Sequence, residues 1–297
     1  MKQIAFETVD VFTETRFGGN PLAVIPDARE LSSDEMQAIA REFKYSESTF
    51  VLPPAEAANT ARVRIFTPAS EIPFAGHPNV GTAFVLGRVG TLFGQELGAV
   101  MRFEEGAGLV TVEVVRRDGT VTGASISAPQ KLERSTEIAP DVVAACASID
   151  AQDVVSENHK PLVASVGLPF VFAQLSSLES LARAAPDAAA FARARTRYGG
   201  SHLRFSLFLY VRLSKSNVRA RMFAPLSNVT EDPATGSASA ALGGLLASLE
   251  RGSDAFSLII EQGVEMGRPS LIEVRVDPRG IAVSGSCVPV MRGVLTL

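Results

Sequence analysis

Hydrophobic and polar residues alternate in several short runs of this chain, a pattern typical of strands with one buried face. Such runs are "ARVRIF" (61–66), "TVEVV" (111–115), "SLFLYVRL" (206–213) and "LIEVRV" (271–276). The N-terminal segment "MKQIAFETVDVF" alternates in the same way and carries Glu7 and Asp10. We therefore expect it to be a first strand and not a signal peptide.

A helical period marks the segment "SSDEMQAIAREF" (32–43). Ser32 and Glu35 have the spacing of a capping box, in which each residue satisfies a backbone N–H of the other. The apolar residues at positions 36, 39, 40 and 43 then lie on one face. This pattern predicts a helix that rests on a sheet with its polar face in water.

Two other segments are small or apolar on all sides, namely "PNVGTAFVLG" (78–87) and "ASAALGGLLASL" (238–249). A helix without a polar face has to be buried all round. We therefore expect an α/β (α+β) fold with two pseudo-symmetric domains. In each domain a strongly curved, barrel-like sheet would wrap around one central buried helix.

Each of these segments follows the phrase Glu-x-Pro-x-x-Gly, once in "EIPFAGHPNVGTA" (71–83) and once in "EDPATGSASAALG" (231–243). Two more echoes occur in the same order: "GNPLAV" (19–24) with "GLPFVF" (167–172), and "RIFTP" (64–68) with "RMFAP" (221–225). This ordered recurrence indicates a duplicated unit. We place the N-terminal domain at residues 1–127, completed by a last strand at 286–297, and the C-terminal domain at 128–285.

Composition and charge narrow the function. The 297 residues are 46% apolar and 20% charged, as in a folded globular protein. The net charge is −4 and the basic residues are scattered, which argues against a nucleic-acid partner. No apolar run approaches the ~18 residues of a membrane helix, and the two cysteines lack metal-ligand spacing. We expect a cytoplasmic protein without a metal site.

The start of each central helix is where chemistry is expected. The first N–H groups of a helix lack internal partners and lie at its positive end, so they favour an anion. Gly76 and Gly236 would let a ligand approach the backbone closely. If both starts face one cleft, that cleft suits a small carboxylate. The chain lacks the glycine-lysine pattern of a triphosphate loop.

The two copies differ at these starts. His77 follows the first glycine and Ser237 the second, while Asp232 stands where the first copy has Ile72. We interpret His77 and Asp232 as functional. The alternatives are a structural histidine, a turn residue before Pro233, and a Ser237 that only caps the helix.

Glu47 lies between two serines in "YSESTFVLP" (45–53), where the first helix gives way to a strand. By spacing alone it reads as an exposed polar residue at the start of a strand. Its assignment to the site needs further information.

Five phrases together resemble the phenazine-biosynthesis PhzF-like isomerases, which belong to the diaminopimelate epimerase fold superfamily. They are "DVFTETRFGGNPLAV", "SESTFVLP", "FTPASEIPFAGHPNVGTA", "EDPATGSASAAL" and "QGVEMGRPS". The resemblance covers almost the whole chain in the right order. It implies a cofactor-free isomerase, often a homodimer, with its active site between two similar domains.

The resemblance also assigns residues. It implies Glu47 as the general acid/base, His77 and Asp232 as its catalytic partners, and Gly236 and Ser237 as a second binding element. Gly76, Asn20 and Thr235, which lie within the matching phrases, are expected to bind substrate. The expected substrate is a small cyclic or unsaturated carboxylic or amino acid, as in phenazine-like biosynthesis. Glu47 would move a proton from one carbon to another on the same face.

Two other functions stay open. One is an amino-acid epimerase or racemase, and the other is a non-catalytic protein that binds a small acid on the same fold. Related epimerases use a cysteine at each helix start. Here Ala75 takes the first of these positions, Ala234 and Thr235 stand near the second, and Cys146 and Cys287 lie far from both in sequence. A two-thiol mechanism is therefore disfavoured.

Overall fold

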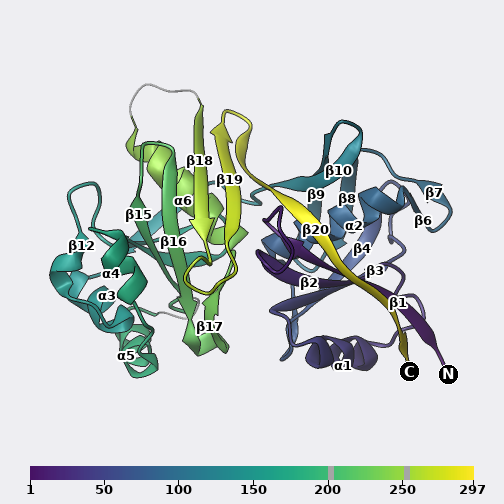
Figure 1. Ribbon diagram of the computed structural model, residues 1–297, viewed down its shortest axis with the longest axis horizontal. Helices are drawn as coiled ribbons and strands as arrows, with labels where there is room; N and C mark the ends of the chain where they lie inside the picture. Colours follow the sequence, from purple (N-terminus) through teal and green to yellow (C-terminus); the bar gives the residue numbers. More distant parts are fainter. Residues whose placement is uncertain (200–203, 251–254) are drawn as a thin grey trace. The chain divides into compact units, whose positions relative to one another are not determined.

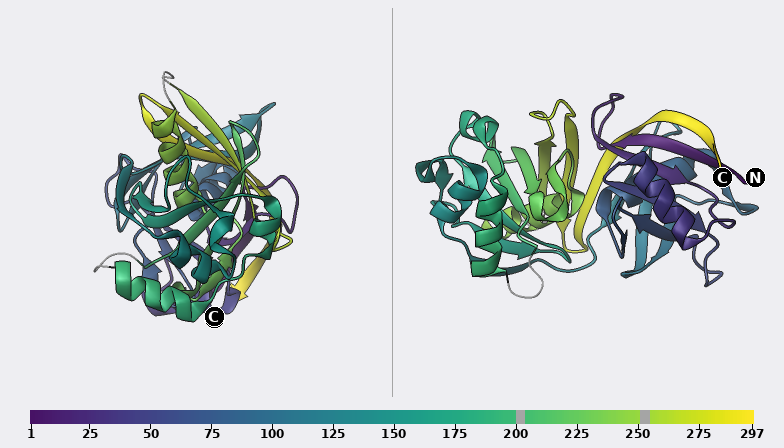
Figure 2. Two further views of the ribbon diagram at one scale, coloured as in Figure 1. Left: turned by 90° about the vertical axis from the view of Figure 1, so that its left-hand side faces the viewer. Right: turned by 90° about the horizontal axis from the view of Figure 1, so that it is seen from below.

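The computed structural model describes residues 1–199, 204–250 and 255–297. The chain divides into two compact units (Figures 1 and 2). Unit 1 comprises residues 1–127 and 284–297, and unit 2 comprises residues 128–283. The helices of the described ranges are too short or too polar to cross a membrane.

Unit 1 is a closed barrel around one helix. Its strands pair in a circle in the order β1, β2, β3, β4, β8, β9, β10, β20 and back to β1. Their bounds are β1 (Gln3–Val11), β2 (Asn20–Ile25), β3 (Glu47–Leu52), β4 (Ala61–Phe66), β8 (Val100–Glu105), β9 (Gly108–Arg117), β10 (Thr120–Ser127) and β20 (Gly280–Thr296). The remaining elements are β5 (Glu71–Ile72), β6 (Thr91–Leu92), β7 (Gln95–Glu96), α1 (Ser33–Phe43) and α2 (Gly76–Val89).

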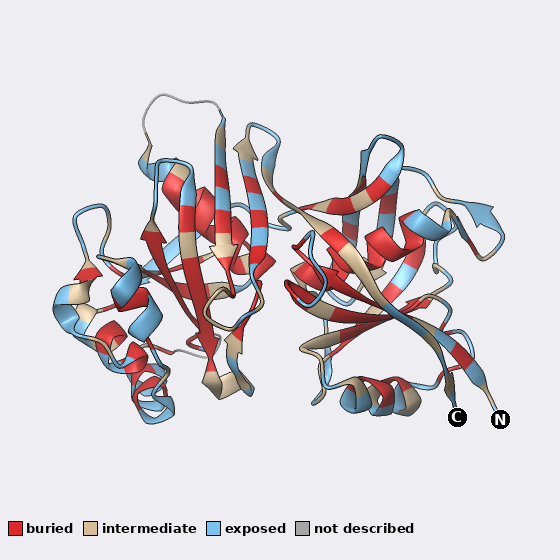
Figure 3. Ribbon diagram, viewed as in Figure 1, coloured by how far each residue is buried: buried red, intermediate tan, exposed pale blue. Residues whose placement is uncertain are grey.

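The central helix of unit 1 is α2, and its residues from 77 to 87 are buried (Figure 3). Small residues on the helix let the strands come close. A Cβ on Gly81 would lie 2.5 Å from Leu22 Cδ2 and 2.8 Å from Val11 Cγ2, so β1 and β2 pack directly on the helix backbone. The predicted buried helix is confirmed.

Helix α1 lies on the outside of the barrel strands (Figure 2). The Ser32 hydroxyl accepts the Glu35 N–H at 3.2 Å, and the Ser32 N–H donates to the Glu35 carboxylate at 2.7 Å. The predicted capping box is present. Met36, Ile39 and Ala40 are buried, so the apolar face packs on the sheet as predicted.

Unit 2 repeats this plan and adds helices. Its strands are β11 (Glu133–Glu137), β12 (Val154–Val155), β13 (Leu162–Ser165), β14 (Pro169–Leu175), β15 (Leu207–Arg212), β16 (Asn217–Ala224), β17 (Val229–Asp232), β18 (Phe256–Gln262), β19 (Ser270–Asp277) and the beginning of β20. Its helices are α3 (Pro140–Ala147), α4 (Leu178–Arg183), α5 (Ala188–Tyr198) and α6 (Gly236–Leu249), with short 3₁₀ turns η1 (Ala151–Asp153) and η2 (Pro225–Ser227). The central helix is α6, and α3, α4 and α5 form a separate layer that packs on β13 to β16 through a shared apolar core (Figure 1).

The order of pairings is the same in both units. In unit 1, β2 and β3 are parallel, β4 pairs antiparallel with β3 and β5, α2 follows, and β8 returns parallel to β4. In unit 2, β14 and β15 are parallel, β16 pairs antiparallel with β15 and β17, α6 follows, and β18 returns parallel to β16. The phrases that recur in the sequence occupy equivalent elements of the two units, and the expected fold of two barrel-like sheets is confirmed.

Candidate functional site

The first candidate group surrounds the start of α2. Its N-cap residue is Ala75, whose methyl side chain cannot accept a hydrogen bond from the first turn. Gly76 is the first helical residue, and Pro78 comes third, where the missing N–H costs nothing. The helix therefore begins with backbone donors at its positive end and no capping side chain.

Glu47 and His77 meet at this point. Glu47 begins β3, where it pairs with Leu22 of the parallel neighbour β2, and His77 is the second residue of α2. The Glu47 Oε2 atom lies 3.5 Å from His77 Nε2. The Glu47 side chain is 18% exposed and that of His77 is 6% exposed. The structure thus brings together two residues that are far apart in the sequence.

His77 is uncharged at neutral pH. Burial lowers the pKa of its imidazole to about 3, so the contact with Glu47 is not an ion pair. Within the described ranges, Nε2 makes no hydrogen bond of good geometry. A neutral imidazole can donate one hydrogen bond and accept another. It can therefore polarise a substrate oxygen or orient the Glu47 carboxylate.

Asn20 secures the chain just before Glu47. It is the first residue of β2 and is 1% exposed. Its Oδ1 atom accepts a hydrogen bond from the Ser46 hydroxyl at 3.0 Å. This bond joins the start of β2 to the residue before β3. The observed contact of Asn20 therefore positions Ser46, which precedes Glu47.

Glu105 is a second acidic group near the start of α2 that the sequence analysis did not single out. It ends β8, and Ala107, two residues further along, donates its N–H to the carbonyl of Pro73, which precedes α2. Both Glu105 carboxyl oxygens are buried without a hydrogen-bond partner in the described structure. Burial raises the pKa of Glu105 to about 8; the side-chain amide of Asn79 lies near enough to lower the pKa, but its geometry is too poor for a full hydrogen bond and burial outweighs it. The carboxyl is therefore mostly protonated at neutral pH.

A sequence signal for Glu105 existed. Met101 and Phe103 are buried on β8, and strand alternation places Glu105 on the same face. The local sequence "MRFEEG" favours the other interpretation, because a glutamate before a glycine is commonly a solvated residue at a turn.

The second candidate group surrounds the start of α6. Thr235 is the N-cap residue, and its hydroxyl donates to the Asp232 Oδ2 atom at 2.5 Å. Asp232 and Thr235 are each 8% exposed. Gly236 is buried and Ser237 is partly exposed at the first turn. The structure brings these four predicted residues together in unit 2, as it brings Glu47, His77, Gly76 and Asn20 together in unit 1.

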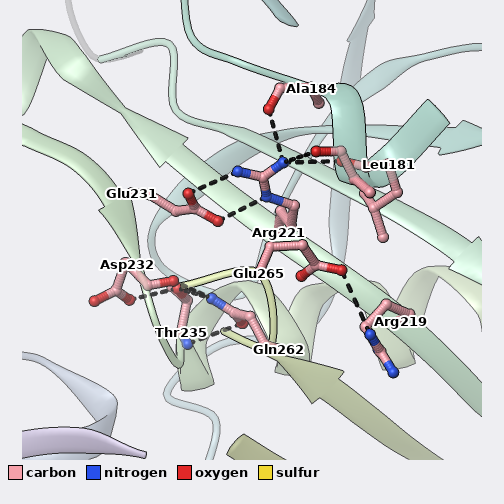
Figure 4. A network of polar contacts seen from close by, with 10 residues as sticks. Leu181, Ala184, Arg219, Arg221, Glu231, Asp232, Thr235, Gln262 and Glu265 are labelled. Carbon is pink, nitrogen blue, oxygen red and sulfur yellow. Dashed lines mark hydrogen bonds and ion pairs between the residues drawn. The ribbon is translucent and has the colours of Figure 1, made fainter. Parts of the chain in front are cut away.

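Gln262 completes this second group (Figure 4). Its Oε1 atom accepts the Thr235 N–H at 3.1 Å. Its Nε2 atom donates to the Asp232 carbonyl at 2.7 Å and to the Thr235 hydroxyl at 3.0 Å. Gln262 begins the phrase "QGVEMGRPS", in which the sequence alone predicts no role for any residue.

The glutamate that opens each repeated phrase has a structural partner. Glu231 binds Arg221 through two bonds of 2.7 and 2.8 Å, and Arg221 also donates to the carbonyls of Leu181, Ala182 and Ala184 (Figure 4). In unit 1, Glu71 binds Arg64 in the same way, at 2.8 and 2.6 Å. These pairs anchor the strand before each central helix. Ion pairing therefore accounts for the two repeated glutamates without a catalytic role.

Neither cysteine stands at the start of a central helix. Cys146 is in α3 and Cys287 is in β20, and both are buried. Burial raises the pKa of Cys146 to about 12 and raises that of Cys287 as well. Neither is suited to act as a thiolate base. Among the described residues, no set of three histidines, cysteines or acidic residues could hold a metal ion.

Comparison with known proteins adds to this geometry. A family model described as "Phenazine biosynthesis-like protein" (PhzC-PhzF) matches residues 9–293. An uncharacterized isomerase of Mesorhizobium japonicum is 39% identical over 280 residues, covering 91% of this chain and 90% of that protein. The trans-2,3-dihydro-3-hydroxyanthranilate isomerase of Pseudomonas chlororaphis is 35% identical over 302 residues, covering 97% of this chain and 98% of that enzyme.

Solved structures show the same fold. The Bacillus anthracis phenazine biosynthesis protein of the PhzF family covers all of this chain, and all of its own, with a TM-score of 0.88 at 24% identity. A hydroxyproline epimerase from Agrobacterium vitis covers 99% of this chain and 91% of its own, with a TM-score of 0.66 at 15% identity. At these identities, both likenesses concern the fold alone.

Proposed function

Because this chain belongs to the phenazine biosynthesis-like (PhzF) isomerases, we propose that it moves a proton on a small cyclic or unsaturated carboxylic or amino acid, with Glu47 as the acid/base residue. The observation that carries the proposal is the Glu47 carboxylate 3.5 Å from a neutral, buried His77 at an uncapped helix start. A carboxylate, a neutral hydrogen-bonding group and backbone donors near one point support this proposal. We propose that the reaction needs no cofactor, as the family resemblance implies.

In the proposed reaction, the Glu47 carboxylate removes a proton from a carbon next to an unsaturated system. The electrons of that C–H bond shift into the conjugated system, and the protonated Glu47 returns the proton to a different carbon on the same face. A new C–H bond forms as the double bond moves, and Glu47 ends as the carboxylate. Atoms and charge balance without an oxidant or a reductant.

The neighbouring groups have separate tasks in this proposal. The backbone N–H groups at the start of α2 bind the substrate carboxylate or stabilise developing negative charge. His77, being neutral, donates or accepts a hydrogen bond without adding a fixed positive charge. Asp232 and Ser237 at the start of α6 would bind a hydroxyl or amino group. That both helix starts serve one substrate, and that the enzyme is a homodimer, are further parts of the proposal.

Solvent-deuterium exchange tests the proposal. The purified protein is incubated in deuterated water with trans-2,3-dihydro-3-hydroxyanthranilate, the compound named for the Pseudomonas relatives, and with a panel of small cyclic and amino acids. We expect exchange coupled to isomerisation for at least one acid. The Glu47→Gln variant should lose about 10²–10⁴-fold of that rate.

The outcomes separate the alternatives. Binding without exchange would favour a non-catalytic binding protein, and exchange confined to a stereocentre with inversion would favour an epimerase. Near-normal exchange by a folded Glu47→Gln variant would show that another residue is the base. A KM increase with unchanged kcat would reassign Glu47 to substrate binding.

A further inference from the structure

We propose that Gln262 is a positioning residue for Asp232, which it holds through Thr235 in one orientation and as a carboxylate. The inference rests on the proposed function in one respect, because it takes Asp232 as a site residue. It goes beyond that function because it assigns a positioning role to Gln262, a residue of the phrase "QGVEMGRPS". It is carried by four hydrogen bonds that join Asp232, Thr235 and Gln262 within unit 2.

The Gln262 amide is fully used. It is 0% exposed at the end of β18 and makes three hydrogen bonds to the segment that precedes α6 (Figure 4). Exchanging its oxygen and nitrogen would set the amide oxygen against the Asp232 carbonyl and the NH₂ group against the Thr235 N–H. Both contacts would then be repulsive, so one orientation of the amide satisfies the site.

This orientation fixes the direction of the next hydrogen bond. The Gln262 NH₂ group can only donate, so the Thr235 oxygen accepts it at 3.0 Å. The single hydroxyl hydrogen of Thr235 then points to Asp232 Oδ2 at 2.5 Å. A hydrogen bond donated to a carboxylate stabilises its ionised form and fixes its rotation. The donors therefore run from Gln262 through Thr235 to the Asp232 carboxylate.

The backbone next to Gln262 approaches the segment before α6 closely. Gly263 has a φ of +75°, and a Cβ there would lie 2.6 Å from the Pro233 carbonyl oxygen. Ser270, 1% exposed, donates to the same carbonyl at 2.8 Å. The segment from 262 to 270 thus lies directly against the residues that start α6. Ser270 supports that segment without touching the Asp232–Thr235 bond, which makes it a matched control.

Two acidic residues near this group have arginine partners, and Arg268 carries a positive charge in the same segment as Gln262. Glu231 binds Arg221, and Glu265 binds Arg219 at 3.4 Å (Figure 4). These pairs do not involve Gln262, but Gln262→Glu adds a charge of its own, so Thr235→Val serves as the comparison that adds none.

A test that does not need substrate is a carbon-13 NMR titration of the aspartate carboxyl groups, with the Asp232 signal assigned by its loss in Asp232→Asn. In Gln262→Glu, the second oxygen accepts where the amide donated and competes for the Thr235 hydroxyl. We expect the Asp232 midpoint to rise by about one pKa unit or more relative to the wild type. Thr235→Val, which removes the hydroxyl but keeps the backbone N–H, should move it in the same direction. Ser270→Ala should leave it unchanged.

An Asp232 midpoint that stays at the wild-type value in folded Thr235→Val and Gln262→Glu would overturn the proposal and leave Gln262 a purely structural residue. A shift in Ser270→Ala as large as in Gln262→Glu would overturn it as well, because loosening of the loop would then be the cause. The isomerase assay separates the positioning of Asp232 by Gln262 from the proposed role of Asp232 in the reaction. If the midpoint moves as expected but Asp232→Asn keeps full exchange activity, the positioning stands and the proposed role of Asp232 in the reaction fails.

Discussion

Replacing Glu105 with glutamine should stabilise unit 1 at neutral and alkaline pH, and the gain should grow as the pH rises. Both Glu105 carboxyl oxygens are buried without a hydrogen-bond partner among the described residues, and burial raises its pKa from 4.5 to about 8. Glutamine has nearly the same shape and cannot ionise. The substitution therefore removes the titration while leaving the packing of β8 intact.

The sign follows from the two pKa values of Glu105. Below the unfolded value of 4.5, both the folded and the unfolded chain carry the proton, and the residue costs nothing. As the pH rises from there to about 8, the unfolded chain releases the proton while the folded unit keeps it, so stability is lost. At about 1.36 kcal/mol per pKa unit, the loss is roughly 3 kcal/mol by pH 7 and at most ~5 kcal/mol above pH 8.

The measurement is urea-induced unfolding followed by circular dichroism from about pH 5 to about pH 8, with amide hydrogen exchange of peptides from β8 and α2 to read unit 1 alone. Glu104→Gln is the matched control. Hydrogen bonds from Asn59 and from the Ala55 and Glu56 N–H groups lower the pKa of Glu104, so this control should lose stability above its titration range. Parallel pH curves for the wild type and Glu105→Gln would refute the reasoning, because Glu105 would then ionise freely in the folded state.

Three further predictions follow from the same structure. The double variant Cys146→Ala with Cys287→Ala should keep isomerase activity, because burial raises the pKa of both thiols; loss of turnover in a folded protein would return the thiol mechanism. The pH profile of kcat/KM should show no inflection from His77 near its ordinary pKa of about 6.5, because burial lowers the pKa to about 3; an inflection there that disappears in His77→Gln would contradict this. Gly81→Ala should destabilise unit 1 by about 1–3 kcal/mol in urea unfolding, because the new Cβ would lie 2.5 Å from Leu22 Cδ2, whereas Gly98→Ala, with its nearest contact at 3.9 Å, should have little effect.

The sequence predicts those parts of the fold that follow from local periodicity. The capped helix at Ser33–Phe43 and the two buried helices at Gly76 and Gly236 could all be found in this way. Their sequences have either one apolar face or no polar face at all, and each pattern has few structural solutions. The duplicated order of strands could be inferred because the echoes recur in one order.

The candidate site is harder to predict because it depends on strand register. The contact of Glu47 with His77 arises from the pairing of Glu47 with Leu22 on β2 and from the place where α2 begins. Spacing alone gave Glu47 no role, and the family resemblance supplied it. Gln262 reaches Asp232 and Thr235 across a long stretch of chain, so its bonds have no local sequence signal.

The internal duplication provides an argument for Asp232 that does not depend on the family. In unit 1, Ile65 of β4 pairs with Ile72 of β5, and at the equivalent place in unit 2, Met222 of β16 pairs with Asp232. The fold forms this pairing with an isoleucine in one copy, so it has no need of an acid in the other. A carboxylate that is 8% exposed costs free energy unless it is hydrogen-bonded.

In the second copy, hydrogen bonds offset this cost: the Thr235 hydroxyl donates to Asp232, and Gln262 orients Thr235. In contrast, the Arg–Glu pairs are present in both copies, as expected of parts that the fold itself requires. Chemistry is therefore best sought where the copies differ, and His77 opposite Ser237 is the other such position at the helix starts. This is the physical reason to test Asp232 together with Glu47 and His77 as residues of the isomerase reaction.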